Sequence, residues 1–171
     1  VATLDAGENR GSFFRPEIGD EVIVGFINEN PNDAVVLGMM NSSAKPAPLA
    51  ASDDNHEKGF VTRSEMKFIF NDDEPSVTLE TPNGNKLVLS DSDGGIKFED
   101  ENGNFIEMNS EGITIESASA IAVKSSTETG LESGTDMNIK AGTQLKAEGS
   151  AGAELSTSAV AVVKGSLVQI N

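Results

Sequence analysis

Hydrophobic and polar positions alternate in an eight-residue repeat over the last third of the chain. From residue 112 the octads read GITIESAS, AIAVKSST, ETGLESGT, DMNIKAGT, QLKAEGSA, GAELSTSA and VAVVKGSL, followed by VQIN. Their second and fourth positions are apolar in thirteen of fourteen cases, and Thr129 is the exception. Residues two apart in an extended strand point to the same face of a sheet. Each octad therefore predicts a short strand followed by a polar turn.

A single strand with two inward side chains cannot be stable alone, so the octads must stack. One chain coiling with three octads per turn would complete barely two turns, because only seven octads are present. Three chains wound together instead supply one strand each to every layer and leave no lateral edge exposed. We therefore predict an intertwined triple-stranded β-helix (a β-prism) in a homotrimer. Thr129 would then face the axis, where its hydroxyl is a candidate contact for water or an ion.

The start of the chain predicts a compact antiparallel β-structure. Residues 21–27 form a β-branched, aromatic-containing run after the turn residues Gly19 and Asp20, and residues 34–38 form a second run. Residues 28–33 between them are dense in Asn, Asp and Pro, which favour turns. Two short strands with a tight connection are typical of a small barrel.

The middle of the chain predicts a linker and then more strands. Residues 42–58 contain two prolines and small polar residues, which are typical of an extended linker. Met66, Phe68 and Phe70 alternate along a predicted strand with one heavily buried face. Asn83-Gly84 is a strong hairpin signal. The predicted fold is all-β, with part of an OB-fold barrel at 1–48, a neck with short strands at 49–80, irregular β-helix repeats at 81–111, and the octad β-helix and tip at 112–171.

The charge distribution narrows the classes of partner. The net charge is −16, and residues 1–111 carry 8 Lys and Arg against 22 Asp and Glu, whereas residues 112–171 carry 4 against 6. Nucleic-acid binding requires clustered Lys and Arg to replace phosphate counterions, so we expect no nucleic-acid partner. The chain contains no cysteine and no apolar run near the ~20 residues that a spanning helix needs. Because it opens at Val1 in strand-like sequence, we interpret it as part of a longer protein.

No catalytic, cofactor or metal site is predicted. His56 is the only histidine and lies in the linker, so it cannot form a catalytic triad or a metal site alone. Asp72-Asp73-Glu74 and the run 91–95 (Asp-Ser-Asp-Gly-Gly) contain possible calcium ligands, but neither has the spacing of a known loop, and solvated turns are the simpler interpretation. Lys124, Lys140, Lys146 and Lys164 are interpreted as solubilising charges. At the chain end, three copies of an apolar tip would form a docking platform for a capping protein. Its residues are Leu167, Val168, Gln169, Ile170 and Asn171.

Two early segments resemble a known family. Residues 10–26 (RGSFFRPEIGDEVIVGF) and 30–38 (NPNDAVVLG) are similar to the valine-glycine-repeat (VgrG) spikes of type VI secretion and to central spikes of phage-like baseplates and extracellular contractile injection systems. Residues 59–64, 81–85 and the octads follow in the order that the family shows. The resemblance implies the later strands of an OB-fold, then a trimeric β-helix. The family's hub domains and effector domains are not in this sequence.

The resemblance also implies a function. We expect a structural, membrane-piercing central spike without enzymatic activity. It would sit on the baseplate hub and tube proteins and carry a PAAR-like tip protein. It would be assembled in the bacterial cytoplasm within the injection particle and delivered or released to the extracellular side. The alternative is a trimeric β-solenoid tail fibre or adhesin that binds a cell-surface receptor, which would need exposed loop insertions that the octads lack. A monomeric β-helix enzyme acting on polysaccharide would need longer coils.

Overall fold

The structure of the chain is a computed structural model that describes residues 1–170, and its regular elements are β-strands. It holds eleven strands and one short 3-10 helix, and no α-helix is formed in the described residues, which confirms the predicted all-β fold. No helix in this part of the chain has the length and apolarity to cross a membrane. The chain divides into two units, Val1–Ile121 and the residues from Ala122 onward, and each is described by itself.

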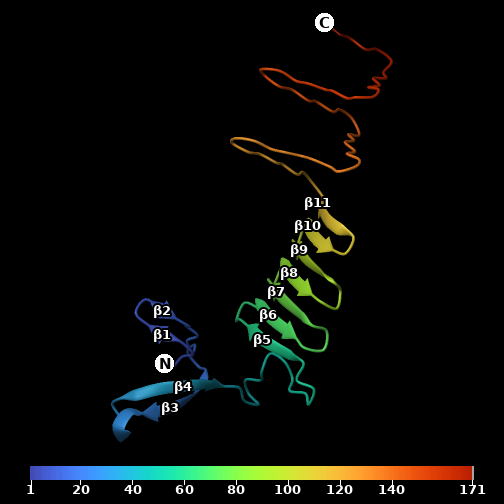
Figure 1. Cartoon of the computed structure of the whole chain (residues 1–171). Coiled ribbons are helices and arrows are strands. Elements are labelled where there is room, and N and C mark those ends of the chain that lie inside the picture. Colours follow the sequence, from blue (N-terminus) through green and yellow to red (C-terminus); the bar gives the residue numbers. More distant parts are fainter. Residues whose placement is uncertain (171) are drawn as a thin grey trace. The chain divides into compact units, whose positions relative to one another are not determined.

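The first forty residues form two small antiparallel pairs of strands (Figure 1). The shorter pair is β1 (Ala6–Gly7) with β2 (Arg10–Gly11). The longer pair is β3 (Glu21–Phe26) with β4 (Ala34–Met40), joined through the 3-10 turn η1 (Ile27–Glu29). These are the two strands and the turn that the sequence predicts for this region.

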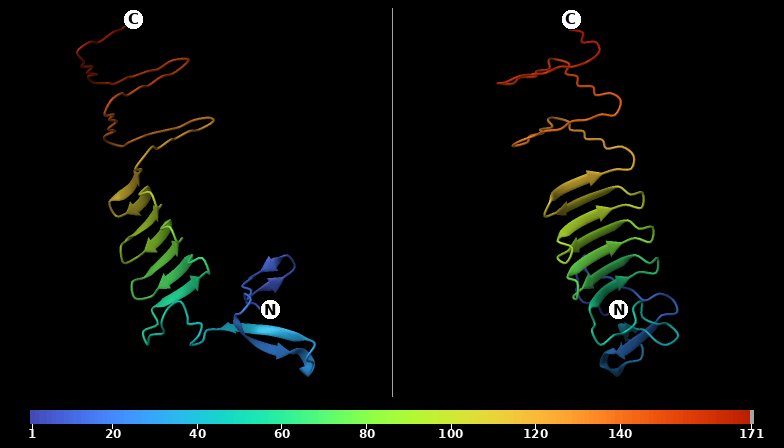
Figure 2. Two further views of the ribbon diagram at one scale, coloured as in Figure 1. Left: turned by 180° about the vertical axis from the view of Figure 1, so that it is seen from behind. Right: turned by 90° about the vertical axis from the view of Figure 1, so that its right-hand side faces the viewer.

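Residues 57–116 form one continuous seven-stranded antiparallel sheet in which each strand pairs with its neighbours in sequence. Figures 1 and 2 show these strands stacked in chain order, from teal to yellow. The hairpin predicted at Asn83-Gly84 joins the third strand to the fourth. We call this sheet the ladder; its strands are β5 (Glu57–Val61), β6 (Lys67–Asn71), β7 (Ser76–Glu80), β8 (Lys86–Ser90), β9 (Gly95–Glu99), β10 (Phe105–Asn109) and β11 (Gly112–Glu116).

The ladder crosses the two domain boundaries that the sequence predicts within this region. Residue 80 ends β7 in the middle of the sheet, and residue 111 lies in the turn between β10 and β11, so neither position interrupts the strand pairing. Regular strands begin at Glu57, inside the segment predicted as a neck.

Three five-residue turns, which connect β5 to β6, β7 to β8 and β9 to β10, share one hydrogen-bond arrangement. In each turn the first residue donates its backbone N–H to the carbonyl of the fifth, and its side-chain oxygen accepts the N–H of the fifth. The pairs are Thr62–Met66, Thr81–Asn85 and Asp100–Asn104, which recur every 19 residues. The fourth residue has a positive φ in all three: Glu65 at 64°, Gly84 at 94° and Gly103 at 83°.

The octad pattern does not predict this 19-residue period. Its signal is visible in Thr-Pro-Asn-Gly-Asn at 81–85 and Asp-Glu-Asn-Gly-Asn at 100–104. The first copy, Thr-Arg-Ser-Glu-Met at 62–66, lacks Asn-Gly, and this hides the relationship. The structure reveals it because all three turns close in the same way.

The octad region forms no strand in the described residues 122–170. Its backbone is extended between bends, and the bends recur at 126–127, 134–135, 142–143, 150–151 and 158–159, the last two positions of each octad. The eight-residue unit of strand-like segment plus turn is therefore present as a backbone path. The inter-strand backbone hydrogen bonds that define a β-strand are missing in residues 122–170, because the described chain supplies no neighbouring strand.

Candidate oligomerisation interface

One face of the ladder is covered by apolar side chains from all seven strands. Antiparallel register aligns them in two rows that run across the strands. The first row is Phe60, Phe68, Leu79, Leu87, Phe98, Ile106 and Ile115. The second row is Lys58, Phe70, Val77, Leu89, Ile96, Met108 and Ile113, in which the lysine is the only polar member. We call these two rows the apolar face.

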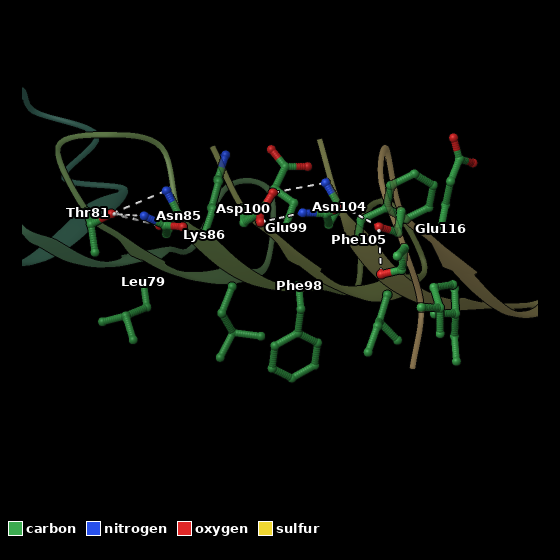
Figure 3. Close-up of a pocket in the computed structure, with 16 residues that line it drawn as sticks. Leu79, Thr81, Asn85, Lys86, Phe98, Glu99, Asp100, Asn104, Phe105 and Glu116 are labelled. Atoms are coloured by element: carbon green, nitrogen blue, oxygen red, sulfur yellow. Dashed lines mark hydrogen bonds between the residues drawn. The ribbon is translucent and has the colours of Figure 1, made fainter. Parts of the chain in front are cut away.

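The opposite face of the ladder is polar and carries a charge ladder. Lys67, Glu80, Lys86 and Glu99 lie directly opposite one another on four successive strands, so the sign of the charge alternates. Lys67 and Glu80 form an ion pair of 3.6 Å. Figure 3 shows the two faces together: Leu79 and Phe98 project from one side of the sheet, and Lys86, Glu99 and Glu116 from the other. Opposite charges on facing strands stabilise the register of the sheet.

A second ionic group lies along the middle of the polar face. Lys97 forms an ion pair with Glu99, which raises the pKa of Lys97 and lowers the pKa of Glu99 through the hydrogen bond between them. The Lys97 ammonium also lies 5.3 Å from the centre of the Phe105 ring. These groups satisfy one another within the chain, so this face can remain in water.

The apolar face stays largely exposed within the described chain, and at one end of it Phe14 stacks on Phe60. No hydrophobic residue among the described residues is buried, and the only buried side chain is that of Ser90. Phe60 is 51% exposed, Leu79 52% and Phe98 45%. A compact monomer of this mass exposes roughly 8,000 Å², whereas this chain exposes 15353 Å². A folded sheet with intact hydrogen bonds but no core requires an apolar partner surface.

An open groove of about 630 Å³ follows the first row of the apolar face. Its floor includes Leu79, Leu87, Phe98 and Ile106, and the side chains of two five-residue turns border it. Figure 3 shows the bonds that hold these turns, from Asn85 to Thr81 and from Asn104 to Asp100. The floor of the groove exposes apolar side chains, and the two turns hold the ends of the strands that carry them.

The chain leaves the ladder beside the last five-residue turn. The Asn104 side-chain oxygen accepts hydrogen bonds from the Ser117 hydroxyl at 2.7 Å and from the Ala118 backbone N–H at 3.0 Å. The Asn104 amide donates to the Asp100 carboxylate at 2.7 Å. The pKa of Asp100 is lowered to about 2, chiefly by this side-chain hydrogen bond and then by the bonds from the backbone N–H groups of Asn104 and Asn102. The segment that follows β11 is thus tied to the five-residue turn between β9 and β10.

The residues considered as chemical sites lie in turns with ordinary partners. Lys58 donates to Asp72 at 2.5 Å, and this bond lowers the pKa of the Asp72 carboxyl. The N–H groups of Asp73 and Glu74 donate to the Asn71 side chain, and Asp93 donates to Ser90. His56 contributes its carbonyl to the same turn by accepting from Asp72 N–H. Within residues 1–170, no three His, Cys, Asp or Glu side chains gather as a metal site.

Other predicted positions lie in the octad region. Lys124, Lys140, Lys146 and Lys164 are exposed, and Lys146 pairs with Glu148. Thr129 is exposed in the single chain. The tip residues Leu167, Val168 and Ile170 are also exposed, with Leu167 at 81%. Gln169 lies among them, and Asn171 is outside the described residues. Docking of a cap at the tip stays a prediction.

The strand predicted around Met66, Phe68 and Phe70 is present as β6, but the expected burial of its side chains does not occur within one chain. Phe70 is 40% exposed and Met66 46%. The alternation identifies the apolar side of the strand correctly. It cannot tell whether the covering surface belongs to the same chain.

Two segments of the chain match known protein families. Residues 76–171 match the phage baseplate V C-terminal trimerisation domain. The chain belongs to the phage baseplate V family. Residues 1–40 match the type VI secretion system/phage-baseplate injector OB domain. No curated protein matches the sequence.

These matches confirm the resemblance to VgrG-like baseplate spikes. The phage baseplate V chain has an OB-domain segment over β1 to β4, and its trimerisation domain spans β7 to β11 and the octads. It is therefore a structural component of a baseplate injector that associates as a homotrimer. Residues 41–75, including β5 and β6, lie between the two matched domains.

Proposed function

We propose that three copies of this phage baseplate V chain form the central spike of a contractile injection system. The observation that carries this proposal is the apolar face: a hydrogen-bonded sheet of seven strands with no buried hydrophobic residue in the described chain. In the proposed trimer each chain supplies one wall of a prism over β7 to β11, the ladder strands that lie in the matched trimerisation domain. The three apolar faces meet at the axis, and the charge ladders remain in water.

Beyond the ladder, each chain supplies one strand to every layer of the prism. The extended segments of residues 122–170 pair with no other strand of the described chain, and the bends between them recur every eight residues. A bend of this kind allows each chain to move to the next wall of the prism while strands of the other two chains pair with it. This arrangement satisfies backbone N–H and C=O groups that a buried strand cannot leave unpaired.

Such a prism is suited to carrying force along its axis. Its stiffness comes from continuous backbone hydrogen bonding between strands. A closed prism also has no lateral strand edge at which it could aggregate. In the proposed mechanism, contraction of the sheath pushes the spike, seated by its OB segment on the hub and tube proteins, through the target membrane. The spike performs no catalysis. A PAAR-like protein caps the tip at Leu167, Val168, Gln169, Ile170 and Asn171.

The proposed location follows from this mechanism. The spike is assembled with the injection particle in the bacterial cytoplasm and then delivered or released to the extracellular side. The net charge of −16 supports solubility before assembly and argues against adsorption to anionic lipid or nucleic acid.

The first experiment is an absolute mass by light scattering after size exclusion, with unboiled protein run on a detergent gel. We expect the mass of three 17.9 kDa chains and resistance to detergent. A folded single chain would contradict the prism. Injection particles that lack the chain should then be complemented with wild type or with a variant that does not trimerise. Intact, contractile particles with the non-trimerising variant would contradict the role as a spike.

A further inference from the structure

We propose that the trimer interface extends beyond the matched trimerisation domain into the hairpin β5–β6, where three copies of the chain pack an aromatic collar around the axis. The collar consists of Phe60, Phe68 and Phe70. The inference rests on the proposed trimeric prism and adds a segment, residues 57–71, that neither family match covers.

The first argument is continuity with the matched domain. Phe68 lies opposite Leu79, and Phe70 lies opposite Val77, in an unbroken antiparallel pairing between β6 and β7. Phe60 lies opposite Phe68 in the pairing of β5 with β6. The apolar rows therefore run from the trimerisation domain into the hairpin without a change of face. A partner chain that covers Leu79 meets Phe68 in the next position of the same row.

The second argument is the state of the aromatic rings. Phe60 and Phe68 stack with centroids 6.5 Å apart, and Phe68 and Phe70 are 4.8 Å apart. Phe14, from the segment between β2 and β3, stacks on Phe60 at 5.2 Å. Even with these contacts Phe60 remains 51% exposed and Phe14 58%. Each aromatic side chain can bury about 150–250 Å², so the hairpin presents a large unpaired apolar surface.

The third argument is where the apolar surface ends. In the second row, Lys58 follows Phe70 as the last residue. Its ammonium is held by the Asp72 carboxylate at 2.5 Å and by the Asn55 carbonyl at 2.7 Å. The charge is thus neutralised at the margin of the row. The inferred interface therefore ends at the Lys58–Asp72 ion pair, next to the aromatic collar.

A second copy of the chain is the occupant that fits these features. A rotational trimer brings the same row of each chain to the axis, so Phe68 meets Phe68 of its neighbours at one level. The surface offers no charge or hydrogen-bonding group along the collar to a polar ligand. The opposite side chains of the hairpin, such as Lys67 and Ile69, point to the other face and stay outside the interface.

The absence of cysteine allows a direct test in the full chain. Phe68→Cys reports on the collar and Leu87→Cys on the matched trimerisation domain. The controls are their sequence neighbours on the opposite face, Ile69→Cys and Val88→Cys. Each variant is treated with a short-span bismaleimide and analysed on a denaturing gel. We expect a band of two cross-linked chains from Phe68→Cys and from Leu87→Cys, because each chain has one cysteine and a reagent molecule joins two. We expect only single chains from both controls.

The outcomes separate the two proposals. Cross-linking at Leu87→Cys without cross-linking at Phe68→Cys would overturn the collar and leave the proposed spike intact. Failure at both positions in a folded protein would overturn the apolar face as the trimer interface, and the collar with it. If Phe68→Cys does not fold, p-benzoylphenylalanine at Phe60 retains the ring. After irradiation it should attach to another chain, and attachment only within its own chain would overturn the collar.

Discussion

The ladder and residues 122–170 use the same alternation of apolar and polar residues, yet the ladder pairs its strands within the chain and residues 122–170 do not. The first octad belongs to the ladder, because it supplies β11. The ladder has turns of two, four or five residues, several of them closed by Thr, Asn or Asp side chains, which fold each strand back onto its predecessor. Residues 122–170 have bends every eight residues and no hairpin. The connection between strands, rather than the strands themselves, thus decides whether the hydrogen-bond partner comes from the same chain.

This difference has a consequence for assembly. Hairpins are local contacts that form quickly, whereas contacts between chains depend on concentration. We expect the ladder to form first and to present its apolar face to two other copies. The octads would then wind together from the end of β11, which hydrogen bonds to Asn104 tie to the turn between β9 and β10.

The largest effect is expected from a charge in the apolar face. Leu87→Asp places one carboxylate per chain at the centre of the proposed prism, at a cost on the order of 3–5 kcal/mol for each uncompensated charge. We expect loss of the trimer at neutral pH by light scattering. Val88→Asp is the matched control, because Val88 faces Lys97 on the polar side. A stable Leu87→Asp trimer would show that the chains do not meet at this face.

The next effect separates the octads from the ladder. Ile139→Ala removes an inward side chain from one octad layer and should cost about 2–5 kcal/mol per chain. We expect a protein that is still trimeric through its ladder, with faster hydrogen exchange and proteolysis confined to residues 122–171. The neighbouring outward substitution Lys140→Ala should leave both unchanged. Equal loosening of residues 57–116 would mean that the two regions fold as one cooperative unit.

A smaller effect is expected in the five-residue turns. Glu65 holds a φ of 64° at the position where the equivalent turns have Gly84 and Gly103. A left-handed conformation is unfavourable for a residue with a Cβ, so Glu65→Gly should stabilise the ladder by about 1 kcal/mol per chain.

The reverse substitution provides the control. Gly84→Ala should destabilise the ladder by about 1 kcal/mol or more, although an added Cβ meets nothing within 4 Å, because the penalty is purely conformational. Denaturant unfolding followed by circular dichroism measures both. Opposite signs for the two variants are the expected result, and a destabilised Glu65→Gly would show that the Glu65 side chain makes a contact that matters more.

The smallest effect concerns pH. Because the pKa of Asp100 is lowered from 3.8 to about 2 by the bonds from Asn104 and Asn102, its contribution to stability is present above pH 3.8 and is lost as the pH falls through about 2. Asp100→Thr copies the equivalent residue Thr81, which keeps the acceptor without a titrating group. The difference in stability between wild type and Asp100→Thr should shrink between pH 4 and pH 2. A difference that does not change with pH would show that the carboxylate is not held by these bonds.

Several elements could be predicted from the sequence because their signals are local. Short β-branched runs bounded by turn residues identify β3 and β4, and apolar residues two apart identify the apolar side of β6. Asn83-Gly84 identifies a hairpin, and each of these signals depends only on neighbouring residues. The octad period likewise predicts the recurring bends. The start of the ladder at Glu57 was less visible, because its first five-residue turn has no Asn-Gly.

The sequence by itself determined the all-β fold, the family and the side of each strand that must be covered. The fold class and the apolar side of the strands follow from side-chain polarity at a period of two, which needs no knowledge of distant contacts. The family follows from the resemblance carried by residues 10–26 and 30–38. Only the tertiary structure decided that residues 57–116 pair within one chain, that the apolar rows are continuous through β5 and β6, and that these rows stay largely exposed in residues 1–170. Strand pairing and exposure depend on which surface lies beside each strand, and the pattern along one strand does not record whether that surface comes from the next hairpin or from another chain.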